Sequence, residues 1–192
     1  MYDLLIGNIR ELVPITEDES KLIQKSFEPI TLNRKQYLLQ SGEPCNHIRF
    51  ISHGCVKLYN LDELGAEHIL QFGISGWWIN DLYAYLTQKP ATFFIQAISE
   101  STVLQIHRDR LNELFDKIHM MDRFFRIKTQ NGYVALQERT INNMSQSAEQ
   151  RYRDFIVRYR DIEQQIPQYM LASYLGVTPE HLSSIRKNIR DH

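Results

Sequence analysis

Near its carboxyl end the chain reads Gln168-Tyr-Met-Leu-Ala-Ser-Tyr-Leu-Gly-Val-Thr-Pro-Glu-His-Leu-Ser-Ser-Ile-Arg-Lys187. The leucines at its start give a first helix a buried face, and Gly176 allows a turn with a positive φ. Thr178 is suited to cap a second helix, in which Pro179 takes the first position because that N–H has no helical partner. The spacing therefore predicts two helices joined by a tight turn, the helix-turn-helix arrangement that binds DNA.

The second predicted helix has an outward face that suits a nucleic-acid surface. Leu182 and Ile185 continue the buried stripe, which leaves short polar and basic side chains on the other side. Such side chains hydrogen-bond base edges in the major groove or contact phosphates. An ordinary helical hairpin that serves only packing is the alternative for this segment. The candidate DNA-binding residues are Thr178, Glu180, His181, Ser183, Ser184, Arg186, Lys187 and Arg190.

The composition of the 192-residue chain is that of a globular protein, with 43% apolar and 23% charged residues. Residues 151–192 hold 7 of the 22 Lys and Arg and 5 of the 23 Asp and Glu, so this region carries +2 while the whole chain carries −1. Apolar runs are too short to cross a bilayer, the N-terminus lacks the features of a signal peptide, and only two cysteines occur. We therefore expect a cytoplasmic protein with no membrane partner, metal or other cofactor.

Residues 27–106 are predicted to form a small antiparallel β-barrel or sandwich, because short segments rich in β-branched and aromatic residues recur about every ten residues. Turns such as His53-Gly54 separate these segments, and the capping box Thr16-Glu-Asp-Glu19 predicts a short helix before them. The predicted strands are residues 29–32, 37–40, 47–52, 55–59, 68–72, 92–98 and 102–107.

From Arg108 the apolar spacing becomes helical and no proline interrupts it before Pro167, which predicts a long helix or two helices in series. Its apolar side chains are more than one small roll can cover, so we expect some to meet a second copy of the chain in a parallel, coiled-coil-like dimer. A second capping box, Ser147-Ala-Glu-Gln150, predicts a further helix. The expected dimer interface comprises Ile118, Met121, Phe124, Phe125, Val134 and Leu136.

With this order of elements, the chain resembles the CRP/FNR family of bacterial transcription regulators. The motifs that carry the resemblance are Leu39-Gln-Ser-Gly42-Glu43, Ile51-Ser-His-Gly54-Cys-Val-Lys-Leu58-Tyr59, Gly65-Ala-Glu-His-Ile-Leu-Gln-Phe72 leading to Gly76, Arg151-Tyr152 and residues 171–187. The resemblance implies an α+β fold with an N-terminal, jelly-roll-like antiparallel β-roll and flanking helices, a long dimerisation helix and a C-terminal all-α helix-turn-helix domain. We expect the sensor domain at 1–117, the dimerisation helix and hinge at 118–146 and the DNA-binding domain at 147–192.

The same resemblance implies a homodimeric transcription regulator without catalytic activity. Its expected partners are an inverted-repeat operator in double-stranded DNA, RNA polymerase and an unknown small-molecule effector, or no effector. Glu180 keeps the family's acidic base-reading position, whereas Pro179 and Ser184 stand where the best-known members carry arginines, so a different operator is expected. The family's β-hairpin wing is expected to be absent or vestigial, because the sequence stops soon after the recognition helix.

The family's cyclic-nucleotide-binding residues are not retained. Its Gly-Glu pair corresponds to Asn80-Asp81 here, and its phosphate-binding Arg-Ser pair to Ala91-Thr92. A buried phosphate needs a paired cation, so cyclic AMP is not expected to bind. Two bulky indoles follow Gly76; we expect them to fill the cavity, and a pocket for a planar or apolar effector is the alternative. The candidate effector pocket comprises Trp77, Trp78, Asn80, Asp81, Ala91 and Thr92.

Two other classes of protein remain open. A cupin-like metalloenzyme would use a β-barrel and several histidines to hold a catalytic metal, but the His-x-His spacing of such sites does not occur. A β-roll module that binds a protein or a small molecule, but not DNA, would use its C-terminal helices only for dimerisation. A metal assay tests the first alternative, and a DNA mobility shift tests the second.

Overall fold

The structure is a computed structural model that describes residues 1–190. Two N-terminal helices, α1 (Tyr2–Arg10) and α2 (Glu17–Ser26), precede the strands. The predicted capping box begins α2, since the Thr16 hydroxyl accepts from the Glu19 amide while the Glu19 carboxylate accepts from the Thr16 amide at 2.7 Å. Helix α1 was not among the predicted elements. Its first residue has no side-chain cap, although Leu5 and Ile9 share one buried face.

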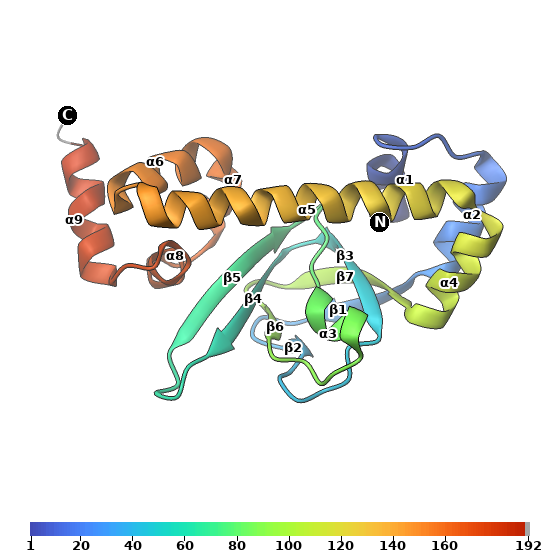
Figure 1. The fold of residues 1–192 in the computed structure, drawn as a ribbon, viewed down its shortest axis with the longest axis horizontal. Helices are drawn as coiled ribbons and strands as arrows, with labels where there is room; N and C mark the ends of the chain where they lie inside the picture. The colour runs from blue at the N-terminus through green and yellow to red at the C-terminus, as the bar shows by residue number, and fades with distance from the viewer. Residues whose placement is uncertain (191–192) are drawn as a thin grey trace.

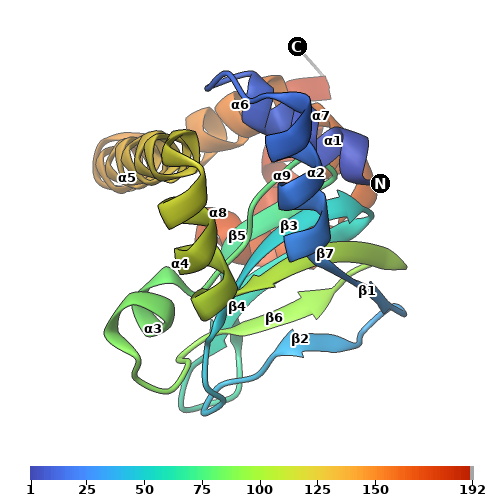
Figure 2. The same cartoon turned by 90° about the vertical axis from the view of Figure 1, so that its right-hand side faces the viewer.

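The β-roll consists of two antiparallel sheets, with strand orders β1-β7-β3 and β2-β6-β4-β5 (Figures 1 and 2). All seven predicted strands are present. Among the described residues the two sheets keep separate edges, so the roll implied by the resemblance forms, and not the closed barrel that the strand pattern alone also allowed. The strands are β1 (Glu28–Leu32), β2 (Tyr37–Leu39), β3 (His47–His53), β4 (Cys55–Leu61), β5 (Glu67–Ile74), β6 (Phe94–Ala97) and β7 (Ser101–His107).

Gly54 makes the corner at which the chain passes from β3 in one sheet to β4 in the other. Its φ is +92°, and a Cβ built there would lie 2.3 Å from the Ser101 hydroxyl oxygen and 2.4 Å from the Glu100 carbonyl oxygen. A residue with a side chain would therefore have to displace the facing backbone. The corner between the two sheets depends on this glycine.

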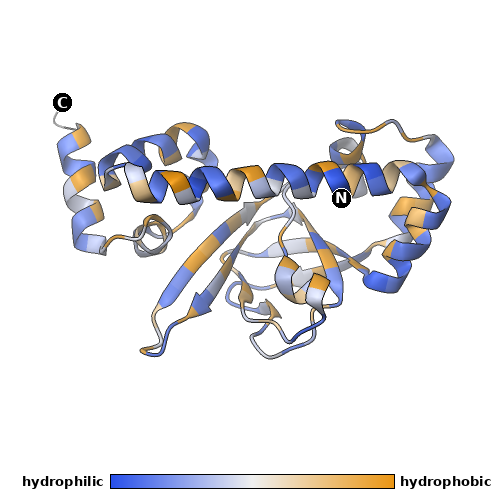
Figure 3. Ribbon diagram, in the orientation of Figure 1, coloured by the Kyte–Doolittle hydropathy of each residue, from blue (hydrophilic) through white to orange (hydrophobic). Residues whose placement is uncertain are grey.

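Two helices in series follow the roll, α4 (Arg108–Lys117) and α5 (His119–Ser145). Ile118 separates them with an extended backbone, φ −133° and ψ 90°. Helix α5 has 27 residues, about 40 Å of helix, and runs along the sheets from α1 and α2 to the C-terminal helices (Figures 1 and 2). Met121 and Phe124 in its first half are buried in the core, and apolar residues continue along its exposed second half (Figure 3).

The C-terminal part is a bundle of α6 (Ala148–Arg158), α7 (Arg160–Gln165), α8 (Gln168–Leu175) and α9 (Pro179–Arg190). Ser147 caps α6 as predicted, since its hydroxyl accepts from the Gln150 amide at 3.2 Å. The core of the bundle is continuous with side chains on the outer face of the second sheet, among them Tyr59, Ile69 and Phe72. The bundle is therefore docked on the roll. No helix within residues 1–190 is long and apolar enough to span a membrane.

The short helix α3 (Leu82–Thr87), between β5 and β6, was also not predicted. Asp81 caps it by accepting from the Ala84 amide at 3.0 Å. The predicted boundaries at residues 117/118 and 146/147 fall beside the break at Ile118 and the cap at Ser147, respectively. The assignment of separate roles to the three segments stays a prediction.

Candidate DNA-binding surface and effector cleft

Helices α8 and α9 have the predicted helix-turn-helix geometry. Gly176 ends α8 with φ +69°, and its amide donates to the Ser173 carbonyl at 3.1 Å. The next amide, that of Val177, donates to the Ala172 carbonyl at 3.0 Å, which closes the turn as in a Schellman cap. The Thr178 hydroxyl then accepts from the His181 amide at 3.2 Å and caps α9.

Helix α9 presents one apolar and one polar face. Leu182 and Ile185 are buried against the bundle. The opposite face carries six of the eight predicted DNA-binding residues, all of them exposed: Thr178, Glu180, His181, Ser183, Ser184 and Lys187. A short polar face free of protein contacts is what a helix needs to enter the major groove.

The other two predicted residues differ from this group. The Arg186 guanidinium lies 3.4 Å from the Glu163 carboxylate, and both side chains are only about one-fifth exposed, 19% and 21%. Arg186 thus joins α9 to α7, and this partner argues against its expected role as a free phosphate contact. The side chain of Arg190 lies outside the described residues.

Glu180 is suited to accept a hydrogen bond from a base. Hydrogen bonds from its own backbone amide and from Thr178 lower the pKa of its exposed carboxyl group. The carboxylate is therefore fully charged at neutral pH, as it must be to accept from a cytosine amino group.

Helix α8 is fixed to the edge of the second sheet by Ser173. Strand β5 is an edge strand of that sheet, so one side of its backbone has no neighbouring strand. The Ser173 hydroxyl accepts from the Ile69 amide at 3.2 Å and donates to the Glu67 carbonyl at 2.5 Å. One side chain thus satisfies two backbone groups of the free edge.

Arg139 of α5 reinforces this contact. Its guanidinium donates to the carbonyl groups of Leu70, Ile69 and Tyr174, the last two at 3.3 and 2.9 Å. It also lies over the Tyr174 ring, 4.0 Å from the centroid. A single arginine therefore ties the long helix to both the sheet edge and α8.

Asp81 and Asn80 have structural roles in the roll. The buried Asp81 carboxylate accepts from the amides of Thr92 and Phe93 at 3.0 and 3.3 Å, in addition to capping α3. The Asn80 side-chain carbonyl accepts from the Arg49 amide at 3.0 Å. The place that the resemblance gives to a cyclic-nucleotide phosphate thus holds the protein's own carboxylate.

Trp78 fills the space between the roll and α5. Its ring lies 5.1 Å from the Phe50 ring and 5.3 Å from the Phe125 ring, measured between centroids. Its indole N–H donates to the Asn8 side chain at 2.9 Å. Trp78 thus fills interior space, as expected. Trp77 instead reaches the C-terminal bundle, with its ring 5.6 Å from the Tyr159 ring.

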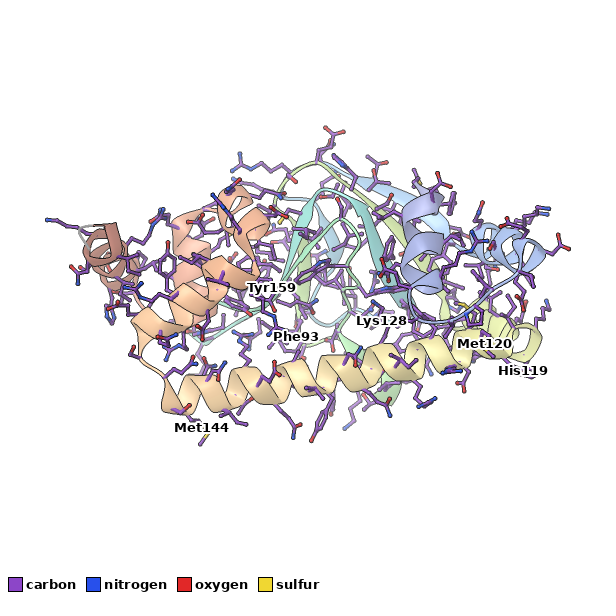
Figure 4. The ribbon with its side chains drawn as sticks, turned by 90° about the horizontal axis from the view of Figure 1, so that it is seen from above. Phe93, His119, Met120, Lys128, Met144 and Tyr159 are labelled. Atoms are coloured by element: carbon purple, nitrogen blue, oxygen red, sulfur yellow. The ribbon has the colours of Figure 1, made fainter. Side chains whose placement is uncertain are left out.

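A cleft of about 690 Å³ lies between the roll, α5 and the bundle (Figure 4). Of the six residues proposed from the sequence for an effector pocket, Trp77, Trp78, Asn80 and Asp81 line it, whereas Ala91 and Thr92 do not. The expectation that Ala91 and Thr92 line the pocket is therefore wrong. The backbone of Ala91 pairs with the loop at Gly42 and Glu43. Two residues that were not among these six, Lys128 of α5 and Tyr159 between α6 and α7, line the cleft as well.

The expected dimer interface is wrong for Ile118, Met121 and Phe124, because all three are buried in the chain's own core. Phe125 and Leu136 lie eleven residues apart, about three helical turns, and both line the cleft. Only Val134 of the expected set is exposed on the opposite face of α5.

The outer face of α5 carries two further exposed apolar residues that are not in the expected interface, Ile141 and Met144. Val134 and Ile141 lie seven residues apart, the spacing of a coiled-coil seam, whereas Ile127, seven residues before Val134, packs partly against the chain's own core. Val134 is 51%, Ile141 61% and Met144 84% exposed. Met144 points away from the cleft in Figure 4.

The cupin-like alternative receives no support from the side-chain arrangement. Throughout residues 1–190, no three His, Cys, Asp or Glu side chains gather as metal ligands would. Cys45 and Cys55 are buried free thiols, and burial raises the pKa of Cys55 to about 12.

Comparison with known proteins agrees with the two-part architecture. Residues 29–118 match the cyclic nucleotide-binding domain family. The anaerobic regulatory protein of Pasteurella multocida is 27% identical over 189 residues, which cover 90% of this chain and 68% of that protein. The structure of FixK2 from Bradyrhizobium japonicum is similar with a TM-score of 0.75 at 16% identity, over 86% of this chain and 85% of that one. CLP from Xanthomonas campestris, a c-di-GMP-responsive global regulator, gives 0.70 at 12% identity over 92% of both chains.

The β-roll, the long helix and the exposed face of α9 define a DNA-binding transcription regulator that joins a sensor-type roll to a helix-turn-helix. Within that class, the chain has a cyclic nucleotide-binding domain over residues 29–118 and is similar to regulators of the CRP/FNR type.

Proposed function

We propose that this regulator is a homodimer that binds an inverted-repeat operator through α9 and responds to a small molecule in the cleft beside α5. The observation that carries the proposal is the polar face of α9, which is exposed from Thr178 to Lys187 while the opposite face is buried. In this arrangement residues 1–117 act as sensor, 118–146 as dimerisation helix and hinge, and 147–192 as DNA-binding domain. Its role is regulatory, with no catalytic step.

The dimer forms along the outer face of α5. Exposed apolar side chains in one stripe of a helix cost free energy in water, and a parallel partner helix covers them by knobs-into-holes packing. The seam comprises Val134, Ile141 and Met144. Since the cleft lies on the opposite face of α5, pairing leaves it open.

At the DNA, Glu180 reads a base edge and Lys187 holds a phosphate. An acidic side chain accepts from a cytosine amino group, whereas an exposed lysine contributes a charge that is independent of sequence. Arg186 stabilises α9 through Glu163 and has at most a secondary contact with the backbone of DNA.

Selection of bound fragments from random DNA, followed by mobility shifts with the purified full chain, tests this proposal. We expect a palindromic sequence with half-sites about one helical turn apart, because a twofold dimer presents two α9 helices. Enrichment of no common sequence, or of one without twofold symmetry, would contradict the proposal and favour a β-roll interaction module.

A further inference from the structure

The cleft beside α5 extends well beyond the position where the resemblance places a cyclic nucleotide. It runs from Trp78 and Phe93 in the roll, along α5, to Arg158 and Tyr159 in the bundle (Figure 4). The nucleotide position itself is closed by the Asp81 carboxylate on the amides of Thr92 and Phe93. The open space therefore lies between the two domains, and its volume of about 690 Å³ is within the range of small-molecule sites.

Most charged groups in this cleft already have partners. The Arg158 guanidinium lies 3.3 Å from the Glu138 carboxylate. Asp154 accepts from the side-chain amides of Gln146 and Gln150 at 3.0 and 2.8 Å. The lining arginines of α5 and α6, Arg139 and Arg151, donate to backbone carbonyl groups. These groups are already paired within the protein and contribute little charge to a ligand.

Lys128 is the exception. It lines the cleft and is half-buried, yet its ammonium group has no hydrogen bond or ion pair among the described residues. The ammonium nitrogen lies over the Phe124 ring, 5.7 Å from its centroid. Desolvation lowers the pKa of Lys128, an effect that the more distant Glu11 opposes. A partly buried cation that forms no direct ion pair with a described residue favours an anionic ligand, since an ion pair there offsets the cost of desolvation.

The walls around this cation are aromatic. Phe93 is half-buried and has no ring partner in the described part of the chain, and the Trp77 ring contacts only that of Tyr159. Aromatic rings prefer edge-to-face or offset stacking with other rings, so a ligand ring is favoured beside these side chains. The cleft thus offers one positive charge and a hydrophobic, aromatic surface.

We propose that the cleft binds an aromatic monocarboxylic acid, with the carboxylate on Lys128 and the ring among Trp77, Phe93 and Tyr159. A single negative charge matches the single free cation, and a doubly charged acid would leave one charge unpaired. Because Trp77 and Phe93 belong to the roll while Tyr159 lies between α6 and α7 of the bundle, the ligand contacts both domains and stabilises the docked arrangement of the bundle. This proposal deepens the regulatory role proposed above.

The fluorescence of the chain's own tryptophans can be used to measure ligand binding. Trp77 and Trp78 are its two tryptophans, and both line the cleft. Titration of the full chain with 3-phenylpropionate should change their fluorescence saturably, and calorimetry should give the dissociation constant. The uncharged analogue 3-phenylpropan-1-ol should bind about tenfold more weakly, because it cannot form an ion pair with Lys128. Octanoate, with the charge but no ring, should also bind more weakly than the aromatic acid.

Two lysine substitutions distinguish a specific effect of the Lys128 charge from a general effect of removing one positive charge. Lys128→Met keeps the length of the side chain and removes its charge, so affinity for 3-phenylpropionate should fall about tenfold. Lys89→Met is the matched control, since Lys89 is exposed, contacts only Tyr83 and does not line the cleft; it should bind as the parent does. Thermal unfolding of both variants verifies that they are folded.

Three results would overturn the proposal: no binding of the acid up to about 10 mM, equal binding of the alcohol, or equal loss in both lysine variants. Octanoate binding as well as 3-phenylpropionate would overturn the aromatic part. These measurements need no DNA. A chain that binds the acid but selects no operator would therefore refute the DNA-binding proposal and leave this inference standing.

Discussion

Ser173 of α8 and Ile69 of β5 are joined by a hydrogen bond of 3.2 Å between the serine hydroxyl and the isoleucine amide. The two residues belong to different domains and lie 104 positions apart in the sequence. Their contact completes the edge of a sheet, where an unpaired strand would otherwise expose its backbone. The position of the helix-turn-helix is therefore set by a backbone edge of the β-roll, on the strand that also borders the cleft.

Ser173→Ala should loosen the bundle from the roll. The change leaves the Ile69 amide and the Glu67 carbonyl without their partner, at a cost of about 1–3 kcal/mol. Hydrogen exchange should show faster exchange of the Ile69 amide. Ser145→Ala is the matched control, because that exposed hydroxyl donates only to the Ile141 carbonyl of its own helix. Unchanged exchange at Ile69 in Ser173→Ala would show that the contact does not hold the domains together.

Val134→Glu should give monomers. It places a charge in the proposed seam on the outer face of α5, where two copies of the charge would face each other. Leu136→Glu is a matched control, since Leu136 is equally exposed, 51%, but lies on the cleft face; this variant should stay dimeric. Sedimentation at micromolar concentration distinguishes these states, and a parent chain that sediments as a monomer would refute the seam.

Phe124→Glu tests whether this position of α5 belongs to the core of its own chain or to the dimer seam. Because Phe124 is fully buried in the core of its own chain, the substitution buries an unpaired charge. Loss of the cooperative thermal transition is the expected result. A folded monomer would instead indicate that Phe124 belongs to the dimer seam, as the apolar pattern alone suggested.

The difference between Phe124 and Val134 shows how far the sequence can predict this molecule. Helical spacing marks both as apolar positions of one helix, but it does not say whether the covering partner is the roll or a second chain. The strands and the two helices joined at Gly176 were predictable because their signals are local: alternation, turn residues and caps. The Asp81 contact to Thr92 and the Ser173 contact to Ile69 were not, because each joins a common polar residue to a backbone group distant in the chain.

Cyclic AMP and cyclic GMP should not bind at physiological concentration. The phosphate position offers Ala91 where the family has an arginine, and the nearby amides of Thr92 and Phe93 are already bound to Asp81. An added phosphate would meet a carboxylate and would have to displace it. Titration calorimetry is the direct measurement, and a dissociation constant in the micromolar range would show that another cation replaces the missing arginine.

Substitutions in α9 should affect DNA binding in two different ways. Glu180→Ala should relax preference at one base pair in each half-site by about 1–3 kcal/mol with little change in salt dependence, because Glu180 reads a base edge. Lys187→Ala should weaken binding to all sequences alike and lower the salt slope by about one unit, because an exposed lysine neutralises a phosphate.

Arg186→Ala provides the comparison that separates a phosphate contact from a structural one. Its guanidinium is paired with Glu163 and is mostly buried, so its loss should lower thermal stability and leave the salt slope of the folded protein close to that of the parent. Mobility shifts over a series of salt concentrations, with the selected operator and with an unrelated duplex, measure all three variants. If Arg186→Ala lowers the salt slope as much as Lys187→Ala does, Arg186 leaves Glu163 to hold a phosphate. If Glu180→Ala discriminates between the two duplexes as well as the parent does, Glu180 reads no base.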